Sequence, residues 1–266
     1  MNDFLVVAGI TLGAMLAGAG VLHMLSRLGS AGRAVAAAFC RAPLLDVPIT
    51  YFTVAPLFAG PIYAGWVGLG GAVAGQVASV LVWGWMHELW HIKDVRRGPR
   101  IVTTINRMVG RPRNHAAAWL TATVTPVFWV VRVAEIFIYT PITWLIGLPR
   151  YRHADWVNVS RQKFAGLVGH DRIWCLYCDW MTGVWSLGTE MLRNVESFWC
   201  PIRFASGAKC ENCKIDFPDV NNGWVRAEGT MAEVTAVIEE KYTGRTERSW
   251  FGHPARLTVE GREPRA

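Results

Sequence analysis

Residues 47–87 read VPITYFTVAPLFAGPIYAGWVGLGGAVAGQVASVLVWGWMH, a run of 41 residues without Asp, Glu, Lys or Arg. As one helix this run would be about 60 Å long at about 1.5 Å per residue, twice the hydrocarbon core of a bilayer. We therefore expect it to fold back once. The glycines of VGLGG (67–71) favour a turn at that place, which predicts membrane helices near 48–66 and 71–91.

A second uncharged run extends from Phe4 to Leu22. It is long enough to cross a membrane, and we expect a helix near 3–25. A cleaved signal peptide is disfavoured, because no basic residue precedes the run and the run is longer than the apolar core of such peptides.

A third apolar region, 114–149, is interrupted by Arg132 and Glu135. Their i, i+3 spacing lets them pair on one helix face. Pro126 and Pro141 predict kinks. We expect two shorter helices near 114–131 and 134–148, forming either a re-entrant hairpin or one crossing plus an interfacial helix.

Basic residues follow the first and third predicted helices and indicate the orientation of the chain. They are Arg27, Arg33 and Arg41 after the first, and Lys93, Arg96, Arg97, Arg100, Arg107, Arg111 and Arg113 after the third. The positive-inside rule places both groups in the cytoplasm and the N-terminus outside, in a cell inner membrane. The net charge of +7 is explained by these loops, so we expect the lipid bilayer and other membrane-protein subunits, and no nucleic acid, as partners.

The predicted fold class is an all-α polytopic membrane protein, with three to five membrane helices or half-helices, that carries a small C-terminal cysteine-rich domain of helical and irregular structure. Residues 1–149 form the membrane domain, 150–243 the cysteine-rich domain, and 244–266 a flexible basic tail. Arg150 and Arg152 favour a cytoplasmic location for the cysteine-rich domain, although a single full crossing by 114–149 would place it outside. Thr230 and Glu233 form a capping-box pattern, which predicts a helix of about three turns over 230–242.

Two C-x2-C pairs lie in the cysteine-rich domain, Cys175 with Cys178 and Cys210 with Cys213. Their spacing resembles that of zinc-ribbon or rubredoxin-like knuckles, in which two such turns complete a tetrahedron of thiolates around one ion. The pattern predicts a metal site that holds zinc or an iron–sulfur cluster. Cys200 is a further candidate ligand.

Other interpretations of the cysteines stay open. They can form disulfides, or remain inert thiols, with Cys178 buried on the apolar stripe of an amphipathic helix from about 174 to 197. A C-x2-C at a helix start also fits a redox pair. His170 and Asp171 are candidate outer partners of such a site, and an ordinary surface or capping role is the simpler reading of His170.

His87-Glu88-Leu89-Trp90-His91 matches the H-E-x-x-H pattern of zinc peptidases. In that hypothesis His87 and His91 bind a metal, Glu88 is the catalytic general base, and Glu135 is the candidate third ligand. The resemblance covers five residues, and Arg132 is a nearer partner for Glu135.

The same segment also fits non-peptidase roles. Trp83, Trp85 and Trp90 predict an aromatic belt that places both histidines at the headgroup level. Glu88 and His91 could bind iron, or a histidine could face a quinone.

Three functional classes follow from these features. The first is an integral membrane metalloprotein or redox component, for example as a subunit of a larger membrane complex. The second is a membrane-embedded zinc metallopeptidase that uses HELWH. The third is a non-catalytic membrane assembly or scaffold protein with structural zinc.

Overall fold

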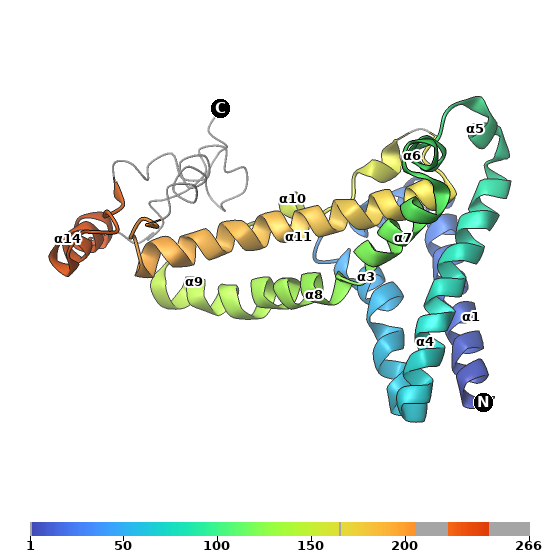
Figure 1. Ribbon diagram of the computed structural model, residues 1–266, viewed down its shortest axis with the longest axis horizontal. Coiled ribbons are helices and arrows are strands. Elements are labelled where there is room, and N and C mark those ends of the chain that lie inside the picture. Colours follow the sequence, from blue (N-terminus) through green and yellow to red (C-terminus); the bar gives the residue numbers. More distant parts are fainter. Residues whose placement is uncertain (1, 165, 206–222, 245–266) are drawn as a thin grey trace. The chain divides into compact units, whose positions relative to one another are not determined.

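A computed structural model describes residues 2–164, 166–205 and 223–244 of the chain (Figure 1). These residues form helices and two isolated β-bridges, and no strand occurs among them. The elements are α1 (Asn2–Leu25), α2 (Gly29–Ala38), α3 (Asp46–Thr53), α4 (Ala55–Trp90), α5 (Ile92–Arg97), α6 (Ile101–Val109), α7 (Arg111–Ala122), α8 (Thr125–Ala134), the π-helix η1 (Glu135–Tyr139), α9 (Thr140–Ile146), α10 (His153–Trp156), the 3₁₀-helix η2 (Arg161–Lys163), α11 (Gly169–Trp199) and α14 (Met231–Tyr242).

Three helical stretches are long and apolar enough to cross a membrane: Asn2–Leu25, Asp46–Trp90 and Arg111–Ile146. For the described residues, the prediction of helical structure with segments long and apolar enough to span a membrane is confirmed. The predicted cysteine-rich domain and basic tail include residues 206–222 and 245–266, which lie outside the described residues.

The chain folds back inside α4, at Ala64 and Gly65. Gly65 has φ +56°, in the region that favours glycine. The backbones of Gly60 and Gly68 touch on either side of this turn, and a Cβ at either position would overlap the other residue's carbonyl. The single fold-back was predicted correctly, but the turn precedes the predicted VGLGG segment, whose glycines instead allow close helix packing.

Glycines of α4 also let α1 approach closely. A Cβ on Gly71 would lie 2.7 Å from the Phe4 carbonyl oxygen, and one on Gly75 would lie 2.6 Å from the Ala8 carbonyl oxygen. Small residues four apart are a common device for packing membrane helices, because they bring two backbones together. Tyr51 of α3 adds a hydrogen bond of 2.6 Å to the Ala14 carbonyl.

The chain divides into two compact units, which are described separately. The first unit comprises Met1–Pro126 and Val157–Thr182, and the second comprises Val127–Trp156 and Gly183–Ala266. This division cuts across the predicted membrane domain and the predicted cysteine-rich domain alike. In the first unit, residues 157–159 are joined to the loop after α2 by backbone hydrogen bonds, Ala42 N–H to Val157 O at 2.9 Å and Val159 N–H to Cys40 O at 2.8 Å.

In the second unit, α8, η1 and α9 pack against the C-terminal part of α11. Gly188 allows this contact, since a Cβ there would lie 2.7 Å from Val131 Cγ1. α14 begins with the predicted capping box, in which Thr230 Oγ1 accepts from the Glu233 N–H and Glu233 Oε2 accepts from the Thr230 N–H. Tyr242 at the end of α14 donates to the Ser197 carbonyl at 3.3 Å.

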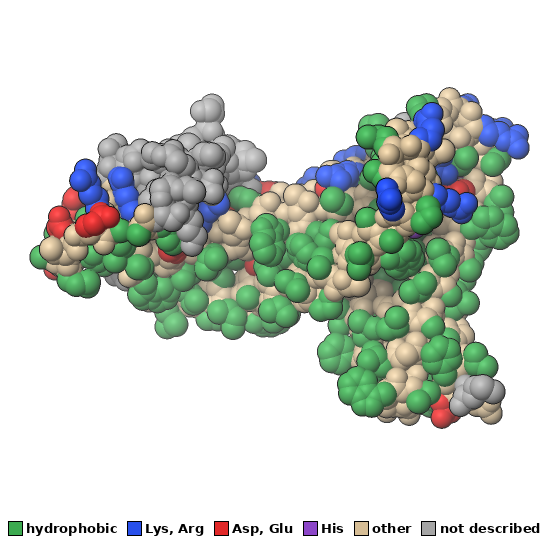
Figure 2. Space-filling view, viewed as in Figure 1, with side chains coloured by type: hydrophobic (Ala, Val, Ile, Leu, Met, Phe, Trp, Pro, Cys, Tyr) green, Lys and Arg blue, Asp and Glu red, His purple; other side chains and the backbone are tan. Residues whose placement is uncertain are grey.

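Hydrophobic side chains cover much of the molecular surface. Figure 2 shows them over α1 and α4 and along α8 and α9. In the apolar 18-residue segment of each candidate span, only 17%, 28% and 11% of the residues are buried. Apolar surface of this extent suits contact with lipid rather than with water.

Candidate functional site

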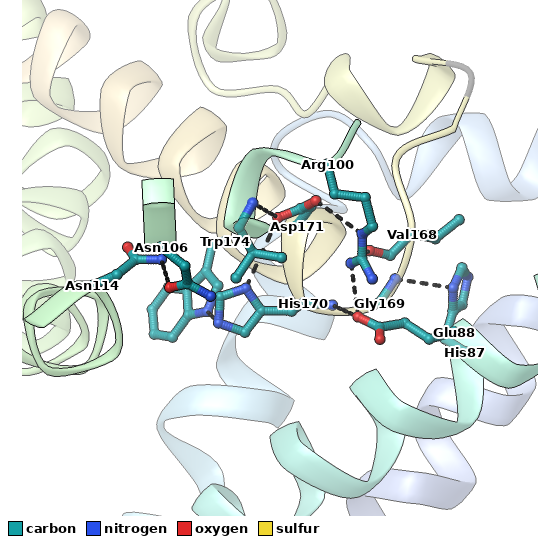
Figure 3. Close-up of polar contacts among 11 residues, drawn as sticks. His87, Glu88, Arg100, Asn106, Asn114, Val168, Gly169, His170, Asp171 and Trp174 are labelled. Carbon is teal, nitrogen blue, oxygen red and sulfur yellow. Dashed lines mark hydrogen bonds and ion pairs between the residues drawn. The ribbon is translucent and has the colours of Figure 1, made fainter. Parts of the chain in front are cut away.

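Three helix ends meet in the first unit: the C-terminus of α4 and the N-termini of α6 and α11 (Figure 3). Polar groups from all three ends interact there. We call this cluster the Arg100 junction, and it consists of His87, Glu88, Arg100, Gly169, His170 and Asp171.

Arg100, the residue before α6, is the central cation of the Arg100 junction. Its Nη2 donates to Glu88 Oε1 at 2.7 Å and to the Val168 carbonyl at 3.1 Å, and its Nε donates to Asp171 Oδ2 at 3.3 Å. The Arg100 side chain is only 12% exposed. The hydrogen bond to Glu88 raises the pKa of the Arg100 guanidinium despite this burial. Arg100 thus binds two acidic side chains from two different helices.

The first backbone N–H groups of α11 are satisfied by the HELWH segment. Gly169 N–H donates to His87 Nδ1 at 3.2 Å, and His170 N–H donates to Glu88 Oε1 at 3.2 Å. The first four N–H groups of a helix have no partner within the helix, and a carboxylate there also interacts favourably with the helix dipole. His87 and Glu88 therefore act as an interhelical N-cap.

Asp171 caps the N-terminus of α6 in the same way. Its Oδ1 accepts from the Val102 N–H, in the first turn of α6, at 2.9 Å. Burial raises the pKa of the Asp171 carboxyl, but hydrogen bonds from His170, Val102 and Arg100 outweigh that effect and hold this pKa below its ordinary value. The α6 and α11 helices are thus joined by a carboxylate that is charged at neutral pH.

Gly169 is required by this geometry for two reasons. Its φ is +53°, which side-chain-bearing residues rarely adopt, and a Cβ at this position would collide with the Glu88 side chain. The backbone of α11 can come within hydrogen-bonding distance of Glu88 only because this position has no side chain.

α7 contributes a second layer of contacts. Asn114 Nδ2 donates to Asn106 Oδ1 at 2.9 Å and links α7 to α6. The His115 ring meets the His170 ring edge-on at 5.1 Å between centroids, and Trp174 Nε1 donates to His170 Nε2 at 3.0 Å. The His170 ring is therefore held by packing and by this hydrogen bond.

The two HELWH histidines do not converge on a common point. Their rings are stacked, with centroids 4.5 Å apart and planes 21° from parallel. The lone pair of an imidazole nitrogen lies in the ring plane, so two nearly parallel rings cannot direct lone pairs at one ion about 2 Å from each. His87 Nδ1 already accepts from Gly169, which places the proton of the neutral ring on Nε2.

Glu88 and Glu135 are also engaged elsewhere. Glu88 is held by Arg100, and a carboxylate paired with a guanidinium is a weak proton acceptor. In the second unit, Glu135 Oε2 pairs with Arg132 Nη1 at 2.7 Å, as their spacing predicts. Among the described residues, no group of three or more His, Cys, Asp or Glu side chains is arranged to hold a metal ion.

His23 at the end of α1 joins the histidine pair and was not singled out from the sequence. Its ring stacks on Trp90 with centroids 5.7 Å apart, and its centroid lies 5.8 Å from that of His87. A lone histidine in an apolar run carries no sequence signal of this contact, because the packing of α1 on α4 creates it.

A second polar cluster is buried within the second unit. Asn194 Nδ2 donates to Tyr151 OH at 2.5 Å and to the Glu190 carbonyl at 3.1 Å, and Tyr151 OH donates to Glu190 Oε1 at 3.3 Å. Arg132 Nη1 also contacts His153 Nδ1 at 2.8 Å. These contacts satisfy buried polar side chains of the second unit.

The four described cysteines are free thiols. Cys178 is exposed, so the interpretation of it as a buried core thiol is wrong. Cys175 is half-buried, and burial raises the pKa of its thiol, the opposite of the activation expected of a redox pair. The pair lies in the second and third turns of α11, beyond the first turn on which the helix dipole acts.

Cys200 is exposed and directly follows α11. The predicted partners of the first pair, Cys210 and Cys213, lie outside the described residues. The shared metal site of the two pairs therefore stays a prediction.

Sequence patterns missed the role of Arg100, and they assigned Asp171 to the surroundings of a cysteine site instead of to Arg100 and α6. Arg100 belongs to a long series of basic residues, and nothing local distinguishes it from its neighbours. Comparison with protein-family models, with curated proteins and with solved structures found no match to this chain.

Proposed function

We propose that this protein is a non-catalytic membrane scaffold or assembly protein. In this proposal the HELWH segment holds the start of α11 next to the membrane helices. The observation that carries the proposal is the 2.7 Å ion pair between Glu88 and Arg100. A peptidase would need Glu88 as its general base, and in this proposal Glu88 makes a structural contact instead.

The other interactions of the motif support the same role. His87 and Glu88 cap α11, and a metal-binding arrangement would require both histidine rings to leave their stacked positions. A scaffold has to fix the position of the helix that it presents, and a cap supplied by another helix does this more firmly than a flexible linker.

The proposal includes the membrane topology of the chain. The N-terminus is outside, while the segment 93–113 and the domain after Arg150 lie on the cytoplasmic side of the cell inner membrane, with other membrane-protein subunits as partners. The basic residues around 93–113 support this orientation. Labelling of single cysteine reporters at Asn2 and Thr104 tests this orientation. Labelling of position 104 only from the outside would contradict it.

We also propose that the cysteine-rich region binds a structural zinc ion or an iron–sulfur cluster. The ligands in this proposal are Cys175, Cys178, Cys210 and Cys213. The support is the spacing of the two C-x2-C pairs. An iron–sulfur cluster would move the function toward the redox class.

The deciding experiment compares wild type with Glu88→Gln, both purified in detergent. A scaffold predicts no cleavage of co-expressed membrane substrates by wild type and a lower thermal midpoint for Glu88→Gln, because the junction loses a charge. A peptidase predicts the reverse, with cleavage by wild type, no cleavage by the variant and an unchanged midpoint. Glu239→Gln, at an exposed position of α14, is the matched control.

A further inference from the structure

The distribution of polarity in residues Val127–Ile146 of the second unit is inverted relative to that of a helix that faces water. Every exposed side chain from Val127 to Ile146 is apolar. These exposed residues are Val127, Val130, Val133, Phe137, Ile138, Pro141, Trp144 and Leu145.

The charged residues of the same segment are inside. Arg132 and Glu135 are 0% and 2% exposed, and they pair with each other at 2.7 Å. In water, exposing large apolar side chains while burying an ion pair is unfavourable on both counts. In hydrocarbon both choices become favourable, because ionisable groups there turn inward and pair.

α11 extends this apolar surface. Trp185, Leu192 and Trp199 are 55%, 64% and 55% exposed. Their seven-residue steps keep them on one face of the helix. Trp185 meets Phe128 of α8 with ring centroids 5.8 Å apart, so the stripe adjoins the apolar face of α8.

A polar residue lies beside this stripe. Ser186 is exposed and lies about 100° around the helix from Trp185. α11 does not belong to the three stretches that are apolar enough to span a membrane. An amphipathic helix with an exposed aromatic stripe is typical of a helix that lies in the membrane interface.

We propose that the C-terminal half of α11 is a bilayer-contacting helix that inserts Trp185, Leu192 and Trp199 among lipid acyl chains. Lipid is the occupant, rather than a second copy of the chain, because the stripe continues the surface of α8 and α9. Those helices belong to the stretch Arg111–Ile146, which is itself apolar enough to span a membrane. Trp144, Trp185 and Trp199 also match the preference of tryptophan for the membrane interface.

The test places a benzophenone photo-crosslinking side chain at Leu192 in the full chain, reconstituted in bilayers of phosphatidylcholine and phosphatidylglycerol. Irradiation should yield covalent lipid adducts, detected as mass shifts in the peptide that contains the probe. The same probe at Ser186 should give several-fold less adduct. A probe at Trp199 repeats the measurement if the first variant folds poorly.

Each outcome is decisive. Lipid adducts at Leu192 and Trp199 in excess over Ser186 support the proposal. Covalent dimers would assign the stripe to a second copy and overturn it, and so would the absence of lipid adducts at both stripe positions. Equal adducts at Leu192 and Ser186 would show that α11 is immersed on all sides and would overturn the interfacial placement. None of these outcomes depends on whether HELWH is structural or catalytic.

Discussion

Glu88 Oε1 accepts a hydrogen bond from Arg100 Nη2 at 2.7 Å and another from the backbone N–H of His170 at 3.2 Å. One carboxylate oxygen therefore joins the C-terminal end of α4 to a basic loop residue and to the start of α11. The residue that makes HELWH look like a peptidase motif has a structural task in this fold.

Replacing Arg100 with Ala should destabilise the first unit by about 2–3 kcal/mol, because Glu88 and Asp171 would lose their shared cation in a largely buried place. Arg97→Ala is the control. Its side chain is 78% exposed and pairs loosely with Asp94 at 3.6 Å, so its effect should stay within about 0.5 kcal/mol. Unfolding of the detergent-solubilised protein measures both, and equal effects would contradict a central role for Arg100.

Gly169→Ala should destabilise the protein more than Gly166→Ala. Both glycines have positive φ, +53° and +81°, so both variants carry the backbone strain of about 1–2 kcal/mol. Only the Cβ at 169 meets Glu88, while the one at 166 has nothing within 4 Å. The difference between the two thermal midpoints isolates the collision with Glu88, and equal midpoints would show that this close approach is unimportant.

The Arg100 junction should weaken in acid. The folded-state pKa of Asp171 lies below its ordinary value of 3.8, so its contribution to stability is present above 3.8 and is lost as the pH falls through the lower folded-state pKa. The gap in thermal midpoint between wild type and Asp171→Asn should therefore shrink between about pH 5 and about pH 2. A gap that does not change with pH would exclude this carboxylate as the cause.

Gly75→Ala should loosen the packing of α1 on α4. Alanine favours a helix over glycine by about 1 kcal/mol, yet the new Cβ would lie 2.6 Å from the Ala8 carbonyl oxygen, and overpacking costs about 1–3 kcal/mol. Gly9→Ala, with nothing within 4 Å of its Cβ, should be neutral or stabilising. Only Gly75→Ala is expected to destabilise, and a stabilising Gly75→Ala would refute the tight crossing.

Cys213→Ser should lower the zinc or iron content of the purified protein, because removal of one of four thiolates opens a tetrahedral site. Elemental analysis and the visible spectrum measure the loss and distinguish zinc from iron–sulfur. Cys40→Ser is the control. Cys40 Sγ accepts a hydrogen bond from Gln162 at 3.3 Å, so this variant should leave the metal content unchanged. Metal-free wild-type protein would remove the predicted site.

The sequence by itself determined the helices that are apolar enough to span a membrane, the single fold-back of residues 47–87, the capping box of Thr230 and Glu233, and the pairing of Arg132 with Glu135. Each of these depends on residues that are close in the sequence. A hydrophobic stretch of about 20 residues and a spacing of three residues both determine structure through the geometry of a single helix, independently of distant parts of the chain.

Only the tertiary structure decided the position of the turn and the role of HELWH. Several glycines between Gly60 and Gly71 could allow a turn, and the close contact of Gly60 with Gly68 selects Gly65. His87 and Glu88 bind N–H groups of residues 82 positions later in the chain. Helix ends need partners, but the partner is set by which ends the packing brings together, and no local pattern encodes that choice.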